Sequence, residues 1–166
     1  MRKLVQRKTK GFTLIELLIV VAIIGIIVAI AIPNLLNAIQ RAKQRRSMGD
    51  ARTIATACEA YAVDLNRYPP AAGYNLPGGL ALPSTTCGGM QNYVQPTYVA
   101  KVPLADGWNS WFNYGTDANY QHYAVLSSGK DGNAQGTPQW GPTTNFNDDI
   151  IFVDGQFVQF PEGVQN

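Results

Sequence analysis

The chain has 166 residues, enough for one domain of ordinary size, with a net charge of +2 and only 14% charged residues. Five of its positive charges lie in the first eleven residues, so the rest has a net charge of −3, and overall charge indicates neither a nucleic acid nor an acidic substrate. One histidine, and two cysteines outside any C-x-x-C spacing, exclude a zinc site of the usual kind.

A basic stretch, residues 1–11, precedes a long apolar segment. From Phe12 to Pro33 there are 22 residues and a single charge, that of Glu16. As a helix this segment would be about 33 Å long, close to the ~30 Å thickness of the hydrocarbon core of a bilayer. A carboxylate in the middle of a membrane costs on the order of 3 kcal/mol, and the chain offers no partner nearby. Cleavage after Gly11 would expose the α-amine of Phe12 as a partner for the Glu16 carboxylate of a neighbouring copy.

The run Gly11-Phe12-Thr13-Leu14-Ile15-Glu16-Leu17-Leu18, followed by Pro33, resembles the leader and first helix of type IV pilins and type II secretion pseudopilins. The resemblance implies that a prepilin peptidase cleaves after Gly11 and methylates Phe12. It also implies that Glu16 neutralises the N-terminus of an adjacent subunit during assembly. The expected partners are further copies of the chain, an inner-membrane assembly platform and minor pilins or pseudopilins, without nucleic acid. The expected location is the bacterial inner membrane, with a periplasmic C-terminal head, before assembly into a periplasmic pseudopilus or a cell-surface pilus.

Two other interpretations compete for the apolar segment. An ordinary membrane anchor explains its hydrophobicity but gives no reason for Glu16 or for Gly11-Phe12 directly after a basic leader. A secretory signal peptide could be cleaved after Ala29-Ile30-Ala31, an A-x-A site. Its apolar region of about 20 residues would, however, exceed the usual length of roughly 7–15 residues and would contain a charge.

The helix is expected to continue well beyond the membrane. Residues 40–66 contain no proline, and small or apolar residues recur with the i, i+3, i+4, i+7 spacing of one buried face. These residues are Met48, Ala51, Ile54, Ala55, Cys58, Tyr61, Ala62 and Leu65. We predict one helix of about 55 residues, with a membrane and assembly half (12–35) and an exposed amphipathic half (36–68). Gly25 and Pro33 favour a kink or local melting, and Tyr68-Pro69 ends the helix.

Four cations, Arg41, Lys43, Arg45 and Arg46, follow the apolar segment closely. They weaken the charge bias that would keep the leader in the cytoplasm. Their simplest role is snorkelling and solvation at the membrane edge, and the alternative is binding to DNA or to acidic neighbours.

After the helix, residues 69–97 are expected to form a connecting loop and residues 98–166 the β-sheet part of the head. Strands are predicted at 98–102, 111–114 and 120–126, and a hairpin at 150–160. Asp154-Gly155 between the two hairpin strands favours a type I′ turn. The predicted fold is α+β, with the long N-terminal helix packed on a small antiparallel sheet.

The two cysteines, Cys58 and Cys87, are compatible with an oxidising compartment. We expect a disulfide between them, which would tie the connecting loop to the helix and contribute roughly 3 kcal/mol. The alternative is a pair of buried free thiols.

No set of nucleophile, base and orienting residue is present in the sequence, and His122 stands alone, so we do not expect an enzyme. Six aromatic residues between positions 108 and 123 are expected to form the core of the sheet, the alternative being a platform for stacking sugars or bases.

Three carboxylates, Asp131, Asp148 and Asp149, lie in loops beside predicted strands, with glycines next to the first of them. Calcium prefers six to eight oxygen ligands, including carboxylates and backbone carbonyls. The residues themselves leave two alternatives open, a calcium site and ordinary turn chemistry.

A second resemblance bears on this choice. Tyr68-Pro69, Val102-Pro103 before Asp106-Gly107-Trp108-Asn109, and Ser127-x-Gly129-x-Asp131-Gly132 followed by Asn147-Asp148-Asp149-Ile150 resemble the major (G-type) pseudopilin of type II secretion. This implies calcium at Asp131, Asp148 and Asp149, with a backbone carbonyl near Ser128. It also implies a structural subunit of a filament that helps to export folded proteins.

Several features depart from that subfamily. Gly107 stands in place of its usual proline, the loop 133–146 is longer, the C-terminus is extended, and the cysteine pair is unusual. These departures leave open a major type IV pilin of an extracellular fibre for adhesion, motility or DNA uptake. The aromatic residues and the basic cluster leave open a second alternative, a membrane-tethered ligand-binding module.

Overall fold

The computed structural model describes residues 11–71, 85–135, 138–163 and 165. Residues 1–10 of the predicted leader and 72–84 of the predicted connecting loop therefore lie outside the described residues. The chain divides into two compact units, Met1–Leu36 and Asn37–Asn166, and we call the second unit the head.

The first unit contains the beginning of helix α1, which spans Leu14–Leu65. Thr13 Oγ1 accepts a hydrogen bond from the Glu16 backbone N–H at 3.3 Å, and Glu16 Oε2 accepts hydrogen bonds from Thr13 N and Oγ1 at 2.8 and 2.7 Å. This reciprocal capping explains why the helix begins here. The helix is assigned without a break through Gly25 and Pro33, so this described segment does not show the local melting considered from the sequence.

By length and composition, the N-terminal part of α1 can cross a membrane, and none of its most apolar window is buried within the protein. Its large apolar side chains are exposed, from Leu14 at 88% to Leu36 at 54%. The predicted apolar helix is therefore confirmed, and its large apolar side chains are not buried by the described part of the chain.

The head contains the remainder of α1, one face of which is buried as the sequence pattern predicted. The buried residues are Gln44, Ser47, Ala51, Ile54, Ala55, Ala57, Cys58 and Tyr61. The helix ends at Leu65 because Asn66 adopts a left-handed conformation, with φ of 54°. This end lies three residues before the predicted stop at Tyr68.

Within the described residues, six strands form one sheet in the order β1-β2-β3-β5-β6-β4. Their bounds are Thr85–Thr86 (β1), Asn113–Thr116 (β2), Tyr123–Ser127 (β3), Gly141–Thr143 (β4), Ile150–Val153 (β5) and Gln156–Pro161 (β6). Neighbouring strands are antiparallel except β4 and β6, which pair in parallel with Gly141 opposite Gln159. The sheet is thus mixed, which corrects the antiparallel prediction. The added strand, β4, comes from residues 141–143 of the segment predicted to be a long loop, and it pairs with β6.

The hairpin of β5 and β6 was predicted correctly. Asp154 and Gly155 both have positive φ, 44° and 91°, as a type I′ turn requires. The predicted strand at 98–102 was wrong, because those residues form the end of a turn, a bend and irregular chain after two short helices, η1 (Cys87–Met90) and α2 (Gln91–Val94). These helices and β1 also lie in the segment predicted to be a connecting loop.

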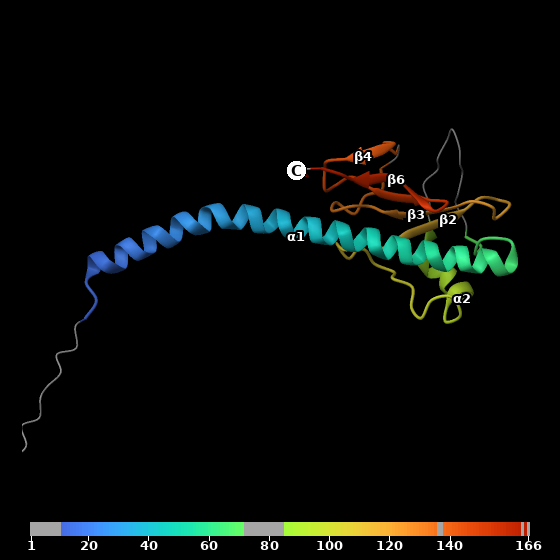
Figure 1. Ribbon diagram of the computed structural model, residues 1–166, viewed down its shortest axis with the longest axis horizontal. Helices are drawn as coiled ribbons and strands as arrows, with labels where there is room; N and C mark the ends of the chain where they lie inside the picture. The colour runs from blue at the N-terminus through green and yellow to red at the C-terminus, as the bar shows by residue number, and fades with distance from the viewer. Residues whose placement is uncertain (1–10, 72–84, 136–137, 164, 166) are drawn as a thin grey trace, which may run out of the picture. The chain divides into compact units, whose positions relative to one another are not determined.

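The core lies between α1 and one face of the sheet, and Figure 1 shows the strands running along the part of α1 that belongs to the head. Side chains of β3 alternate between two clusters, since Tyr123 and Val125 join the main core while Ala124 and Leu126 join a smaller cluster on the other face. Phe112 in the main core is fully buried, whereas Trp111 is 58% exposed. Of the six aromatic residues expected in the core, Phe112, Tyr114 and Tyr123 are there, whereas Trp108 and Tyr120 are partly exposed and Trp111 is exposed.

Cys58 and Cys87 are free thiols, both fully buried in the main core cluster. The disulfide expected from the sequence is not present, and the structure corresponds to the alternative of two buried thiols. Burial raises the pKa of the Cys58 thiol to about 12 and that of the Cys87 thiol well above its usual value. Both groups are therefore neutral and unreactive while the head is folded.

Candidate functional site

The predicted processing and assembly residues are grouped at the N-terminal end of α1. Gly11 and Phe12 are exposed, and Phe12 is 81% accessible. Contrary to the expectation from the sequence, the Glu16 carboxylate has a nearby partner in its own chain, since Thr13 donates two hydrogen bonds to Oε2. Both donors are neutral, so the carboxylate keeps its full charge in an apolar segment. A cationic partner is still required wherever this segment is removed from water.

The predicted calcium ligands lie in two segments that the fold brings together. The Lys130 backbone N–H donates to the Phe146 carbonyl at 2.9 Å. A Cβ on Gly129 would lie 2.7 Å from the Asp148 carbonyl oxygen, and the φ of Gly129 is 63°, so only glycine permits this close approach. The Ser128–Asp131 segment therefore runs directly against Asn147–Asp149, as a shared site would require.

We call Asp131, Asp148 and Asp149 the carboxylate cluster. Asp149 is fully buried, and its Oδ1 has no hydrogen-bond partner among the described residues. Burial, and secondarily the charges of Asp131 and Asp148, raise the pKa of Asp149 to about 6, although its hydrogen bond with the backbone of Gln135 acts in the opposite direction. A buried carboxylate oxygen without a donor, close to two other carboxylates, is a site with an unmet need for positive charge.

Gln135, which sequence analysis did not identify, is hydrogen-bonded to two carboxylates of the cluster, those of Asp148 and Asp149. Its backbone N–H donates to Asp149 Oδ2 at 2.7 Å and its side-chain amide to Asp148 Oδ1 at 3.0 Å. The buried Gln159 donates in turn to Gln135 Oε1 at 3.1 Å and to the Asp149 carbonyl at 3.0 Å. Asp131 is exposed, and its Oδ1 accepts a hydrogen bond from Asn133 N at 3.0 Å.

The described residues contain no group of three or more His, Cys, Asp or Glu side chains close enough to hold a metal ion. Asp148 Oδ1 accepts a hydrogen bond from the Gln135 side chain, and Asp131 Oδ1 accepts one from Asn133 in its own turn. The structure thus brings the three predicted segments together without closing their side chains around one point.

A second feature missed in the sequence is the docking of residues 105–111 on α1. Asp106 is buried, and its Oδ1 accepts hydrogen bonds from Trp108 N and Ser110 N, both at 2.9 Å. The Gly107 N–H donates to Ser47 Oγ at 2.9 Å, and Trp108 Nε1 donates to Gln40 Oε1 at 2.7 Å.

A Cβ on Gly107 would overlap the Lys43 carbonyl oxygen and lie 2.8 Å from the Lys43 Cα. A proline at this position would also lack the N–H that donates to Ser47. The docking of this loop therefore explains why Gly107 replaces the proline that is usual in the G-type subfamily.

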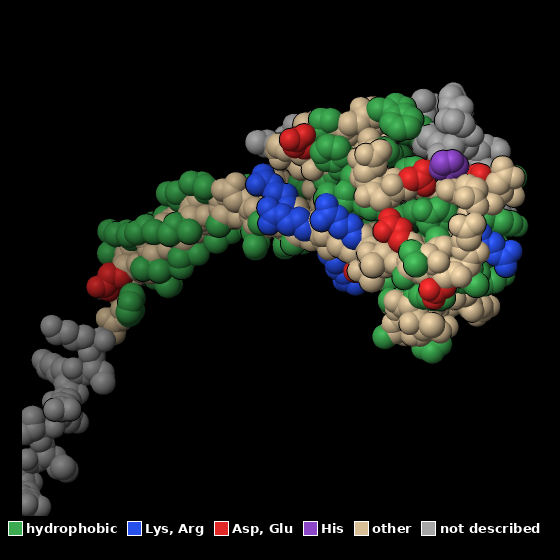
Figure 2. Space-filling view, turned by 45° about the vertical axis from the view of Figure 1, so that its right-hand side comes forward, with side chains coloured by type: hydrophobic (Ala, Val, Ile, Leu, Met, Phe, Trp, Pro, Cys, Tyr) green, Lys and Arg blue, Asp and Glu red, His purple; other side chains and the backbone are tan. Residues whose placement is uncertain are grey.

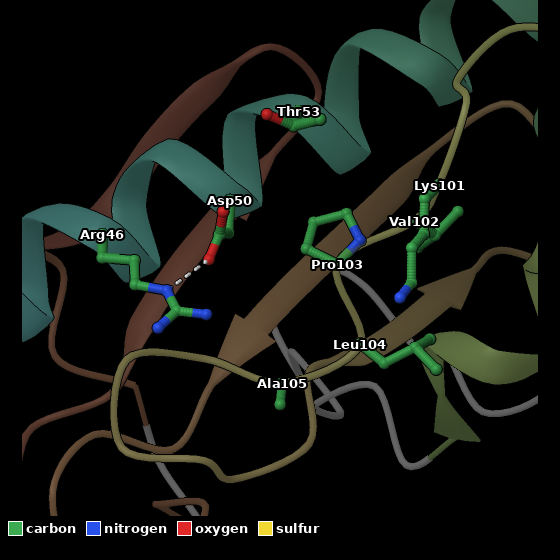
Figure 3. A pocket seen from close by; sticks show the side chains of 8 residues that line it. All are labelled: Arg46, Asp50, Thr53, Lys101, Val102, Pro103, Leu104 and Ala105. Carbon is green, nitrogen blue, oxygen red and sulfur yellow. Dashed lines mark hydrogen bonds and ion pairs between the residues drawn. The ribbon is translucent and has the colours of Figure 1, made fainter.

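An open pocket of about 480 Å³ lies beside this loop (Figure 3). Arg46 and Asp50 of α1 form an ion pair across 3.4 Å at one side, and Lys101 contributes a second cation. The walls are formed by the short side chains of the segment Val102–Ala105 and by Thr53. The ionisable side chains among its lining residues are those of Arg46, Asp50 and Lys101.

His122, the other candidate for chemistry, is exposed and pairs with Asp154 at 2.8 Å between Nδ1 and Oδ2. Asp154, in the turn between β5 and β6, also accepts a hydrogen bond from Tyr123 N at 2.9 Å, which fixes its side chain against β3. No serine, threonine or cysteine side chain is hydrogen-bonded to this histidine in the described part of the chain.

Comparison with known proteins gives a consistent result. The family model described as type II secretion system (T2SS), protein G matches residues 34–144, and the prokaryotic N-terminal methylation motif matches residues 6–32. The type II secretion system core protein G of Pseudomonas aeruginosa is 31% identical over 145 residues, covering 84% of this chain and 99% of the relative. The proteins of the same name in Dickeya chrysanthemi and Escherichia coli K12 are 28% and 29% identical over 127 residues. These alignments cover 76% and 75% of this chain, and 81% and 84% of the relatives.

Proposed function

Because this chain belongs to the family of type II secretion system protein G, the major pseudopilin, we propose that it polymerises through the apolar part of α1 into a periplasmic pseudopilus. In this proposal it is a structural subunit and not an enzyme. A prepilin peptidase removes the leader after Gly11 and methylates Phe12. The subunit waits in the inner membrane, and an assembly platform and minor pseudopilins help to bring copies together.

The exposed apolar face of α1 carries this proposal. Its large side chains, from Leu14 to Leu36, are all at least 42% exposed. A continuous apolar surface of this length does not stay in water, so it is covered either by lipid or by other protein. Polymerisation replaces lipid contacts by protein contacts, because the face that contacts lipid before assembly contacts neighbouring copies afterwards.

Glu16 supplies the specificity of this exchange. Its carboxylate is bound only by the neutral donors of Thr13, so a filament core that encloses it gains by adding a cation. The methylated α-amine of Phe12 on a neighbouring copy is the cation that cleavage creates. Pairing of the two charges sets the register between subunits, because a slipped register leaves both charges unpaired in an apolar core.

The experiment compares Glu16→Ala with Glu162→Ala, which removes an exposed carboxylate from the head. Membrane content, the N-terminal mass and the yield of sheared filaments are measured for both variants. The Glu16 variant should be inserted and cleaved to a chain that begins at methylated Phe12, but it should assemble poorly. The Glu162 variant should behave as wild type. Filament yields equal to wild type for the Glu16 variant would refute the assembly mechanism.

A second part of the proposal is that calcium binds at the carboxylate cluster. The residues fit the ion in one respect, because the buried Asp149 Oδ1 lacks a donor and repulsion from Asp131 and Asp148 adds to the raised pKa of Asp149. The three carboxylates would hold the ion, with the carbonyl of Ser128 as a further oxygen ligand. The ion would supply the positive charge that these carboxylates lack.

A further inference from the structure

We call Arg41, Lys43, Arg45 and Arg46 the basic collar, and we propose that the collar binds the phosphate groups of anionic phospholipids at the outer surface of the membrane. Figure 2 shows several lysine and arginine side chains, in blue, close together along α1. The inference rests on the proposed function only in that the apolar part of α1 lies in a bilayer. It adds a lipid partner for a surface of the head.

The collar has more positive charge than its surroundings neutralise. Among the described residues, Arg46 is the one member with a carboxylate within ion-pair distance, 3.4 Å from Asp50. Arg41 and Arg45 are exposed, stand one helical turn apart, and line a pocket of about 350 Å³. Glu162 also lines this pocket but lies beyond the 4.0 Å ion-pair limit from both arginines. The pocket therefore presents two arginines to an anion, and arginine binds phosphate through paired hydrogen bonds.

The backbone that carries the collar is held in place by the rest of the head. Trp108 binds Gln40 just before the collar, and Gly107 binds Ser47 just after it, at 2.7 and 2.9 Å. Between them, the buried Gln44 donates to Gln165 Oε1 at 3.1 Å. The cations thus extend from a fixed turn of helix, which lowers the entropic cost of holding an anion there.

The place of the collar in the sequence matches the depth of the lipid phosphates. The collar begins five residues after Leu36, the last residue of the first unit, and at 1.5 Å per residue this is about 8 Å of helix. The headgroup layer adds roughly 5–8 Å to each side of the hydrocarbon core. Trp108, whose ring N–H is bound beside the collar, belongs to a residue type that is enriched at this level of a membrane.

This partner also accounts for an otherwise unfavourable feature of the sequence. Cations on the translocated side oppose the usual charge bias of membrane insertion, and binding to anionic lipid would offset part of that disadvantage. Anionic lipids attract a nearby Lys or Arg by about 1 kcal/mol, which is about fivefold in binding for each cation. The head carries no comparable density of cations elsewhere on α1, where Arg52 is the next one along the helix.

The test uses the full chain, unassembled, reconstituted in phosphatidylcholine bilayers with a trace of spin-labelled phosphatidylglycerol or phosphatidylcholine. Electron paramagnetic resonance gives the fraction of each lipid immobilised by the protein, and hence the preference for the anionic lipid. The collar variant is Arg41→Gln/Lys43→Gln/Arg45→Gln. The matched control, Arg52→Gln/Arg67→Gln/Lys101→Gln, removes the same charge from other parts of the head. The leader is identical in all three proteins, so its cations cancel in the comparison.

We expect the collar variant to lose at least fivefold in preference for phosphatidylglycerol. The control should keep the wild-type preference, and replacing chloride in the buffer by inorganic phosphate at the same ionic strength should not abolish the preference of the wild type. An unchanged preference in the collar variant would overturn the proposal, as would an equal loss in the control. Collar-dependent binding of duplex DNA without a lipid preference would overturn it in favour of nucleic acid. No immobilised lipid at all would overturn the membrane anchor and the collar together, whereas poor filament assembly leaves this measurement unaffected.

Discussion

Substitution of Gly107 by alanine should destabilise the head, because the added Cβ has no room. It would overlap the Lys43 carbonyl oxygen and lie 2.8 Å from the Lys43 carbonyl carbon and Cα. The obstacle is helix backbone, which cannot rotate away, so the loop must move. That movement would break the hydrogen bond from Gly107 N to Ser47 and the one from Trp108 Nε1 to Gln40.

The expected cost follows from these losses. Each hydrogen bond contributes about 1 kcal/mol, and residual overpacking adds about 1–2 kcal/mol, for a total of about 3–4 kcal/mol. For a folded head of this size, such a loss lowers the melting temperature by about 10–15 °C. The assay is a thermal melt of the full chain in detergent, followed by near-ultraviolet circular dichroism, which reports on the aromatic core.

Gly49 provides the matched control on the same helix. A Cβ at Gly49 meets no atom within 4 Å, so Gly49→Ala should stabilise the helix by about 0.5–1 kcal/mol. If Gly107→Ala melts within about 2 °C of the wild type, the loop is not clamped on α1 and our explanation of the missing proline fails.

Three further predictions concern the carboxylate cluster and the thiols. Calcium should raise the melting temperature of the wild type and of Asp117→Ala but not of Asp131→Ala, and identical wild-type melts in calcium and in chelator would remove the site. Because the pKa of Asp149 is raised to about 6, its contribution to stability without calcium is full below about pH 4 and is lost as the pH rises through 6. Asp149→Asn should flatten this part of the pH dependence measured by denaturant unfolding, and an unchanged profile would contradict the assignment. The native chain should resist alkylation at Cys58 and Cys87 at pH 8 and take up two alkyl groups after unfolding, whereas no uptake after unfolding would indicate a disulfide.

Local patterns predicted the parts of the fold that depend on neighbouring residues. The spacing of small and apolar residues around Ile54 and Cys58 identified the buried face of α1, because a helix repeats every 3.6 residues. The dipeptide Asp154-Gly155 identified the hairpin, since a type I′ turn requires positive φ at both positions. These signals lie within a few residues of the feature that they specify.

Features that depend on distant residues could not be predicted in this way. The segment 98–102 has the composition of a strand, but its apolar residues serve the core directly, with Tyr98 against Tyr61 and Val102 fully buried. Strand β4 contains a glycine and a proline and is recognised only through its pairing with β6. The pattern of carboxylates located the candidate calcium site, but it gave no sign of Gln135, which lies in the long loop and binds two of them.

The central claim, that copies of this chain are joined by a charge pair between Phe12 and Glu16, has a direct test. Filaments are assembled from a mixture of two populations, one labelled with ¹⁵N at the N-terminal amine and the other with ¹³C at the Glu16 carboxylate. Solid-state nuclear magnetic resonance then detects ¹⁵N–¹³C proximity between different copies. We predict an intermolecular contact of about 3–4 Å, the distance of an ion pair. The absence of this contact in well-ordered filaments would contradict the account.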